Sequence, residues 1–393
     1  MSRALKMGAT GFGLIAVCYG FARFAFGLFL PQIRTDLALS DTYAGTIAGG
    51  AFLAYVIAIM ISARTCERMG AKAVAVISGL TAAAGMLGIA ISPSPTWLAM
   101  FVVLAGVSTG LASPPMALAV SQGVDRAQQN ATNTVINAGT SGGVVISGLV
   151  ALGMSERWRE VFVLFAGSAL AAALAAWRWL PSGSAESVTS PRKAAHVRTP
   201  ARGTLWQLIG ASFLAGVSST ALWSFGGEMA ARRLHWSTHG ISLLWIAIGA
   251  AGVSGAAAGI LVTRLGINRV HRGFLAILAT GTSMAGLSFT TPLATVLGGA
   301  LFGSAYVMLT GIYLVWGTSA LPHRPASGLM VGFLTLAIGQ TAGAPLFAQL
   351  MQRTSLQTAT IAFSCLAVSA GLFQFNGHLK ASKTAAAPAT MKS

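Results

Sequence analysis

Charged side chains are scarce in this sequence. Its 393 residues include 25 Lys and Arg and 8 Asp and Glu, so 8% are charged, whereas soluble domains carry about 25%. Hydrophobic residues make up 54%. This composition excludes an ordinary soluble enzyme and a disordered scaffold, and it predicts a multi-span membrane protein.

Acidic residues are rarer than basic ones, which leaves a net charge of +17. A nucleic-acid partner would need these positive charges gathered on a solvated face. Most of this chain could not be solvated, because it is too apolar. We therefore expect no nucleic-acid partner and a lipid bilayer as the surroundings of the protein.

Residue groups that would hold a metal or a cofactor are also missing. The three cysteines, Cys18, Cys66 and Cys365, are an odd number without metal-ligand spacing, which excludes a secreted disulfide framework. The sequence has no GxxxxGK(S/T) motif for ATP phosphates, no HExxH motif and no paired acidic motif. We therefore expect no cofactor, no metal and no enzymatic activity.

Long apolar stretches are abundant, and each is long enough to cross about 30 Å of hydrocarbon as a helix. They lack the alternation of membrane β-strands. Twelve spans are predicted near residues 9–30, 42–62, 73–92, 96–120, 132–153, 160–180, 205–226, 240–262, 272–290, 293–317, 327–350 and 357–376. The first has no evident small-residue cleavage site, so we predict a retained span and no removed signal peptide.

One connection differs from the short loops between the other spans. Residues 181–204 are polar, basic and rich in Ser and Pro, which is typical of a flexible cytoplasmic linker. The linker divides the chain into a six-span half over 1–180 and a second six-span half over 205–378. A disordered tail is predicted over 379–393.

The basic residues outside the spans favour one side of the membrane. If the N-terminus lies in the cytoplasm, 18 Lys and Arg fall on inner segments, 6 on outer loops, and only Arg23 on neither. Positive residues mark cytoplasmic segments. We therefore predict a multi-pass protein of the cytoplasmic (inner) cell membrane with both termini in the cytoplasm.

The two halves carry related sequences. Arg68 and Gly70 after the second span correspond to Arg264 and Gly266 after the eighth, at an offset of 196 residues. Glycines at positions 139 and 143 recur at 339 and 343, at an offset of 200. Such self-similarity indicates a duplication. Six spans per unit give parallel repeats, with a substrate site expected between them near the midplane.

At this point the sequence resembles the major facilitator superfamily, from residue 8 to about residue 376. The specific part is the loop signature between spans 2 and 3, whose places are held by Ala63, Glu67, Arg68, Gly70 and Lys72. The sequence departs from this signature at two places, where Ala63 replaces the family's Gly and Glu67 replaces its Asp. The family's span 4 arginine is missing from residues 102–110, and its span 5 proline from residues 139–148.

The segment over residues 19–31 looks like the first span of the YbfB/YjiJ-like bacterial branch of this superfamily. The resemblance implies an all-α polytopic fold of 12 transmembrane helices in two pseudo-symmetric halves. It also implies transport by alternating access of the two halves.

Arg23 is the one basic residue in the middle of a predicted span. It lies eight positions before Pro31, about 12 Å along a helix, which is too far for full snorkelling. A charge at this depth faces a cavity or a partner. We expect Arg23 to contact an anionic substrate, most simply a carboxylate, through two parallel hydrogen bonds. The alternative is a structural role, paired with backbone carbonyls, Glu228 or Asp36.

Further candidates for substrate contact follow from the spans that line the cavity in this superfamily, which are 1, 4, 7 and 10. On these spans the candidates besides Arg23 are Tyr19, Phe26, Ser219, Trp223, Tyr306, Thr310 and Tyr313. Packing against lipid or anchoring at the interface is the alternative for the aromatics. The amides Asn137 and Gln340, deep in spans 5 and 11, could bind substrate or join helices by hydrogen bonds.

Charged residues at the span ends supply candidates for gating and coupling. The resemblance implies an inner gate at Glu67, Arg68, Gly70, Lys72, Arg264, Gly266 and Arg269. Topology alone is the alternative reading of these charges. The carboxylates nearest to the pathway, and therefore the candidates for proton coupling, are Glu228, Asp36 and Asp41. A solvated outer ion pair is the alternative for Glu228.

These features favour a secondary active transporter that moves a small organic solute across the membrane by alternating access. Arg23 favours an anion, and a proton or solute gradient would supply the energy. We expect a monomer whose partners are the solute, a coupling proton and the bilayer. The alternatives are an efflux pump for apolar or cationic compounds, a receptor without transport, and a lipid-modifying enzyme.

Overall fold

The computed structural model describes residues 3–154, 156–181, 202–321 and 325–376, and in these ranges the chain is helical without strands. Most of the predicted linker and the whole predicted tail lie outside these ranges. Nine helices of the described part are long and apolar enough to cross a membrane. The fold class predicted from the sequence is confirmed.

The first half consists of six crossings. The first crossing consists of α1 (Arg3–Ile15), η1 (Ala16–Phe24) and α2 (Ala25–Leu37), which together form one continuous helical span. The helix α3 (Asp41–Ala90) supplies two crossings, because the backbone of Gly70 is not helical. The half is completed by α4 (Pro95–Gly123), α5 (Arg126–Gly153) and α6 (Trp158–Trp179).

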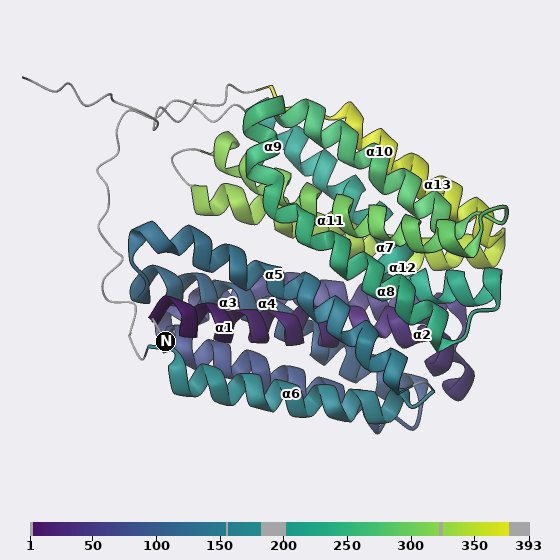
Figure 1. Cartoon of the computed structure of the whole chain (residues 1–393), viewed down its shortest axis with the longest axis horizontal. Helices are drawn as coiled ribbons and strands as arrows, with labels where there is room; N and C mark the ends of the chain where they lie inside the picture. The colour runs from purple at the N-terminus through teal and green to yellow at the C-terminus, as the bar shows by residue number, and fades with distance from the viewer. Residues whose placement is uncertain (1–2, 155, 182–201, 322–324, 377–393) are drawn as a thin grey trace, which may run out of the picture.

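The second half repeats this order. Its elements are α7 (Arg202–Leu234), α8 (Thr238–Gly252), η2 (Val253–Ala257), α9 (Ala258–Leu265), α10 (Ile267–Gly286), α11 (Pro292–Ala320), α12 (Pro325–Arg353), α13 (Leu356–Ser369) and η3 (Ala370–Leu372). The segments α8, η2 and α9 form one crossing, as do α13 and η3. Figure 1 shows the two halves side by side, the first in purple to blue and the second in green to yellow.

Two glycine positions show that the halves are structural repeats. Gly70 and Gly266 both have a positive φ, 80° and 83°, which glycine adopts without a steric penalty. Gly139 and Gly143 of α5 lie against the backbones of α1 and η1, and Gly339 and Gly343 of α12 lie against the backbone of α7 in the same way. The recurring glycines therefore mark the same corner and the same close helix contact in each half.

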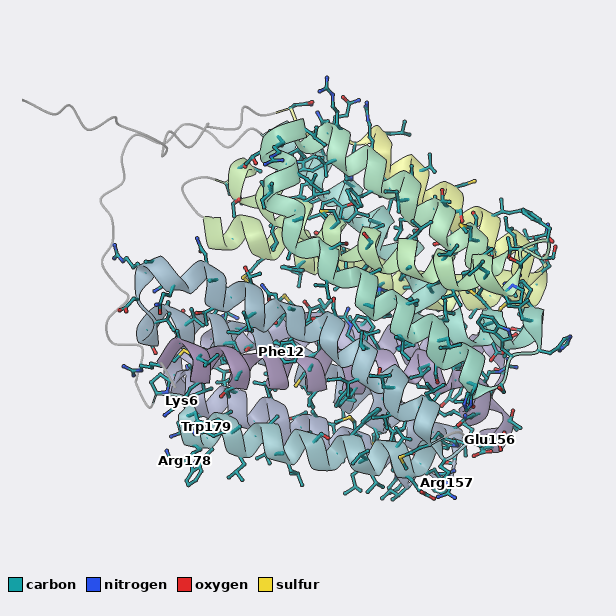
Figure 2. The ribbon with its side chains drawn as sticks, viewed as in Figure 1. Lys6, Phe12, Glu156, Arg157, Arg178 and Trp179 are labelled. Carbon is teal, nitrogen blue, oxygen red and sulfur yellow. The ribbon has the colours of Figure 1, made fainter. Side chains whose placement is uncertain are left out.

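The two ends of the bundle differ, and we name them by their charges. The basic end holds the start of α1, the corner at Gly70 and the end of α6, where Figure 2 shows Lys6, Arg178 and Trp179. The ion-pair end holds the α2–α3 and α7–α8 connections, and Figure 2 shows Glu156 and Arg157 on that side. An α5 residue therefore approaches the ion-pair end as its number rises.

Contacts between the halves are made by α3 with α12, α5 with α8, and α2 with α7. Small residues bring these helices together: Gly45 and Gly49 of α3 lie against the α12 backbone near Pro345. Gly148 of α5 packs against α8, and Gly249 of α8 packs back against α5. Such contacts let membrane helices approach closely, and here they place η1 between the halves.

Candidate functional site

Arg23 lies on η1, a segment of π-helix in the middle of the first crossing. Its residue is only 8% exposed. Stretches of π-helix are rare and are found frequently at functional sites. The irregular segment therefore coincides with the one basic residue that the sequence places in the middle of a span.

A chain of hydrogen bonds joins Arg23 to the second half. Its Nη2 donates to Oε1 of Gln340 on α12 at 2.6 Å. Nε2 of Gln340 donates in turn to Oγ of Ser219 on α7 and to the hydroxyl of Tyr306 on α11, each at 3.2 Å. Four elements thus meet at one polar cluster between the halves.

Aromatic rings surround the guanidinium. The Cζ atom of Arg23 lies 4.3 Å from the ring centre of Tyr55, 4.8 Å from Phe52, 5.1 Å from Phe24 and 5.7 Å from Tyr19. These distances fall within the range of cation–π attraction, which stabilises a desolvated cation. The rings hold the positive charge in place and leave it unneutralised.

Arg23 has hydrogen-bonding capacity to spare. A guanidinium carries five N–H donors, and within the described ranges Nε is buried and has no partner. No carboxylate of the described residues forms an ion pair with it. A buried donor without a partner is costly in a protein interior, and this Nε is therefore free to donate to a further acceptor.

Trp223 of α7 extends the site. Its ring stacks on Phe24 at a centroid distance of 4.0 Å and meets the edge of Tyr306 at 5.2 Å. In the described part of the chain its Nε1 is buried without a partner. The hydroxyl of Tyr19 is 2.8 Å from Oγ of Ser113 on α4, so this ring also has a polar tip in the site.

Six of the residues singled out from the sequence are joined by these contacts: Tyr19, Arg23, Ser219, Trp223, Tyr306 and Gln340. The other four lie elsewhere. Tyr313 donates to the carbonyl of Ala211 inside the second half, and Thr310 donates to the carbonyl of Val307 on its own helix. Phe26 is buried in the core and Asn137 is exposed on α5.

Sequence reasoning missed three of the rings around Arg23, namely Phe24, Phe52 and Tyr55. The resemblance directs attention to spans 1, 4, 7 and 10, whereas Phe52 and Tyr55 lie on span 2. One signal was present: the chain has only five tyrosines, and Tyr19, Tyr55 and Tyr306 all fall in mid-span. A polar-tipped ring at this depth needs a partner.

A cluster of four charged side chains bridges the halves at the ion-pair end. Asp41 accepts from Nη2 of Arg232 at 2.5 Å and pairs with Nη1 of Arg34 at 2.9 Å. Glu228 pairs with Nε of Arg232 at 2.6 Å and also with Arg34. The side chain of Asp41 is only 12% exposed and that of Glu228 only 6%. Each carboxylate therefore lies between two arginines, one from each half.

Two neutral hydrogen bonds add to this closure. Gln32 of α2 donates to Oγ1 of Thr238 on α8, and Thr42 of α3 donates to Gln352 of α12. Asp36 is not part of the cluster, because it accepts from Nε1 of Trp158 within the first half at 2.6 Å. The ion-pair end is thus tied across the two halves by polar contacts.

The residues predicted to form the gate lie at the basic end. Glu67, Arg68, Arg264 and Arg269 are exposed, and none of them has an ion pair among the described residues. The ammonium of Lys72 lies 5.8 Å from the ring of Trp177 on α6. Ion pairs therefore join the two halves at the ion-pair end, whereas Glu67, Arg68, Arg264 and Arg269 form none with the described residues at the basic end.

Solved structures share this architecture. The inward open conformation of the xylose transporter XylE from E. coli aligns with a TM-score of 0.78 at 12% identity, covering 96% of this chain and 98% of that one. The nucleoside transporter NupG aligns at 0.74 with 14% identity, covering 95% and 98%. A bacterial homologue of the human lysosomal transporter Spinster aligns at 0.72 with 16% identity, covering 94% and 95%.

At these identities the likeness shows a shared fold, and no curated protein matches the sequence. The family is shown by the sequence itself, since the model of the Major Facilitator Superfamily matches residues 12–344. This match begins within the first crossing, continues through both halves and ends within the eleventh crossing. The chain belongs to the major facilitator superfamily and is a membrane transporter of small solutes, not an enzyme.

Proposed function

We propose that the protein is a secondary active transporter of a small organic anion, with Arg23 as the residue that binds the anionic group. The observation that carries this proposal is a buried guanidinium between the halves with an unused donor and, within the described residues, no carboxylate partner. A carboxylate accepts two parallel hydrogen bonds from a guanidinium. Export of cations is disfavoured, because the site already holds a positive charge.

Substrate binding at Arg23 would affect contacts of both halves. The guanidinium belongs to η1, while its partner Gln340 and the residues beyond it, Ser219 and Tyr306, belong to the second half. A substrate that accepts from the remaining donors of Arg23 would lie beside this contact between the halves and alter it. Substrate binding and alternating access are thereby coupled through the same atoms.

The basic end is proposed to face the cytoplasm, which places both termini there and the protein in the inner cell membrane. The excess of Lys and Arg at this end supports the orientation. The state described here would then be open toward the cytoplasm. We propose that Glu67, Arg68, Lys72, Arg264 and Arg269 come together when that end closes.

Proton coupling is proposed for the charged cluster at the ion-pair end. Glu228 and Asp41 hold the halves together through Arg34 and Arg232. Protonation of either carboxylate removes its charge and weakens the pairs across the halves, so that this end can open. Asp36 is less suited to this role, because its partner Trp158 belongs to the same half.

The proposal is tested by uptake into proteoliposomes that hold the purified full chain. Labelled carboxylates, neutral sugars and lipophilic cations are offered with and without an imposed pH gradient. We expect saturable uptake of at least one carboxylate that depends on the gradient. Uptake of a cation or a neutral sugar alone, or no gradient-dependent flux of any solute, would contradict the proposal. The YbfB/YjiJ-like branch and the monomeric state remain proposals beside it.

A further inference from the structure

Three asparagines form a row on α5 that the proposed binding site does not use. Asn130, Asn133 and Asn137 are spaced i, i+3 and i+7, so they lie on one face of the helix. Among the described residues no hydrogen bond engages their side-chain amides, and the bond from Thr134 goes to the backbone carbonyl of Asn130. Uncommitted amides in a membrane helix need a polar environment, because lipid offers them no partner.

The amide row faces the interior of the protein, away from lipid. Val135, Ile146 and Leu149 are exposed apolar residues that mark the lipid side of α5. A turn of about 100° per residue places Asn133 and Asn137 roughly opposite these three side chains. Asn130 and Asn137 are nevertheless exposed. An exposed face that points away from lipid borders a solvent-accessible space.

This space ends close to the Arg23 site. Val144 continues the amide face by two further turns toward the ion-pair end, where it is only 1% exposed and lies against Gly20 of η1. Arg23 follows Gly20 by three residues, about one turn of helix. The amide row therefore runs from the basic end toward the level at which η1 begins to cover α5.

The eighth crossing leaves α5 toward the basic end. Near the ion-pair end α5 packs tightly on α8, where Gly249 and Gly252 lie against Ser141. Directly after Gly252 the chain changes to the 3-10 helix η2, and Val253 and Ser254 are exposed. The segment η2 still contacts α5, whereas α9 after it packs on α10 and α11, so the two crossings separate beyond η2, toward the basic end.

The duplicated half shows that the fold does not require these amides. At the offset of 200 residues that relates α5 to α12, the three asparagines correspond to Met330, Phe333 and Ala337. The α12 helix makes the same glycine contacts as α5 with these apolar side chains in place. A structural demand of the repeat would apply to both copies, so the amides serve a function of the first half.

We infer that the amide row is a hydrogen-bonding wall of the path between Arg23 and the basic end, and that the transported anion is a carboxylate bearing hydroxyl groups. An amide both donates and accepts hydrogen bonds, as does a hydroxyl group. A hydroxylated solute can exchange its water for these amides as it leaves Arg23. This inference rests on the proposed function, since it assumes that an anion binds at Arg23.

The lining of the path is tested by thiol labelling of the full chain in proteoliposomes. The three native cysteines are replaced by Ala, and Asn133→Cys and Asn137→Cys are compared with Val135→Cys and Leu149→Cys on the lipid side. A charged, membrane-impermeant thiosulfonate should label the first pair at least about tenfold faster, because a thiolate does not form in lipid. Equal labelling of both pairs would overturn the inference.

The substrate class is tested by calorimetric binding of gluconate and of hexanoate, its hydroxyl-free counterpart, to the full chain in nanodiscs. The double variant Asn133→Leu with Asn137→Leu should lose gluconate affinity by about tenfold and keep its hexanoate affinity. Retained hexanoate binding also shows that the variant is folded. An unchanged gluconate preference, or no preference in the parent, would overturn the inference while leaving the anion site intact. Parent protein that binds neither carboxylate would instead count against the proposed function.

Discussion

At the scale of single residues, Gln340 decides how Arg23 is held. Its amide oxygen accepts from Arg23 and its amide nitrogen donates to Ser219 and Tyr306, so one side chain fixes the guanidinium and the second half together. A neutral acceptor satisfies a charged donor without cancelling its charge. Arg23 is therefore positioned by a neutral partner and keeps its full positive charge.

Replacing this amide tests its positioning role. Gln340→Leu removes the acceptor but keeps similar bulk, so a carboxylate should bind about tenfold more weakly, at a cost of about 1–2 kcal/mol. The measurement is calorimetric binding by the full chain. Gln128→Leu, at an exposed position of α5, is the matched control and should bind as the parent does. An equal loss of carboxylate affinity in both variants would show that Gln340 does not position Arg23 for binding.

At the scale of secondary structure elements, η1 depends on its close approach to α5. An added Cβ at Gly20 would collide with the backbone of Gly143, whereas nothing lies within 4 Å of the same position at Gly13. Both glycines belong to the first crossing. Substitutions at Gly20 and Gly13 therefore distinguish the effect of the close contact with α5 from the general effect of glycine on helix stability.

Gly20→Ala should destabilise the protein by about 1–3 kcal/mol through overpacking. Gly13→Ala should be neutral or stabilise it by up to about 1 kcal/mol, because alanine is the better helix former. Thermal unfolding of the purified variants in detergent measures the difference. Equal unfolding temperatures for the two variants would contradict the close contact between η1 and α5.

The elements were largely predictable from the sequence, because apolar length and glycine spacing are local signals. The spans, the corners at Gly70 and Gly266 and the exceptional depth of Arg23 all follow from them. Contacts between distant elements were less accessible. Tyr306 and Tyr313 share one helix face by their spacing, yet only Tyr306 is linked to Arg23, through Gln340. Tyr313 instead contacts Ala211 and His271 inside its own half.

At the scale of the whole molecule, the cluster of Arg34, Asp41, Glu228 and Arg232 holds the ion-pair end closed. The i, i+4 spacing of Glu228 and Arg232 indicates one of these pairs. No pattern along the chain predicts the pairs between the halves, since Arg232 and Asp41 lie 191 residues apart. Breaking a buried pair by removing one charge is strongly destabilising to the paired state. A change of about 2 kcal/mol between two conformations alters their ratio about thirtyfold.

Glu228→Gln should therefore shift the protein toward a state that is open at the ion-pair end. Cysteines that replace Thr42 and Gln352, which are hydrogen-bonded across the halves, report this state through their disulfide yield in a background without native cysteines. We expect a clear fall in yield. Glu160→Gln, which removes an exposed pair with Arg157, should leave the yield unchanged, and a similar fall there would contradict a specific latch.

The central claim is that Arg23 binds the anionic group of the transported solute. The most direct measurement is carboxylate uptake by Arg23→Gln at matched expression, beside Arg157→Gln, whose side chain is 68% exposed at the ion-pair end. Loss of a charge-assisted contact should lower uptake by Arg23→Gln at least about tenfold and leave Arg157→Gln near the parent. Carboxylate uptake by Arg23→Gln equal to that of the parent would contradict the account.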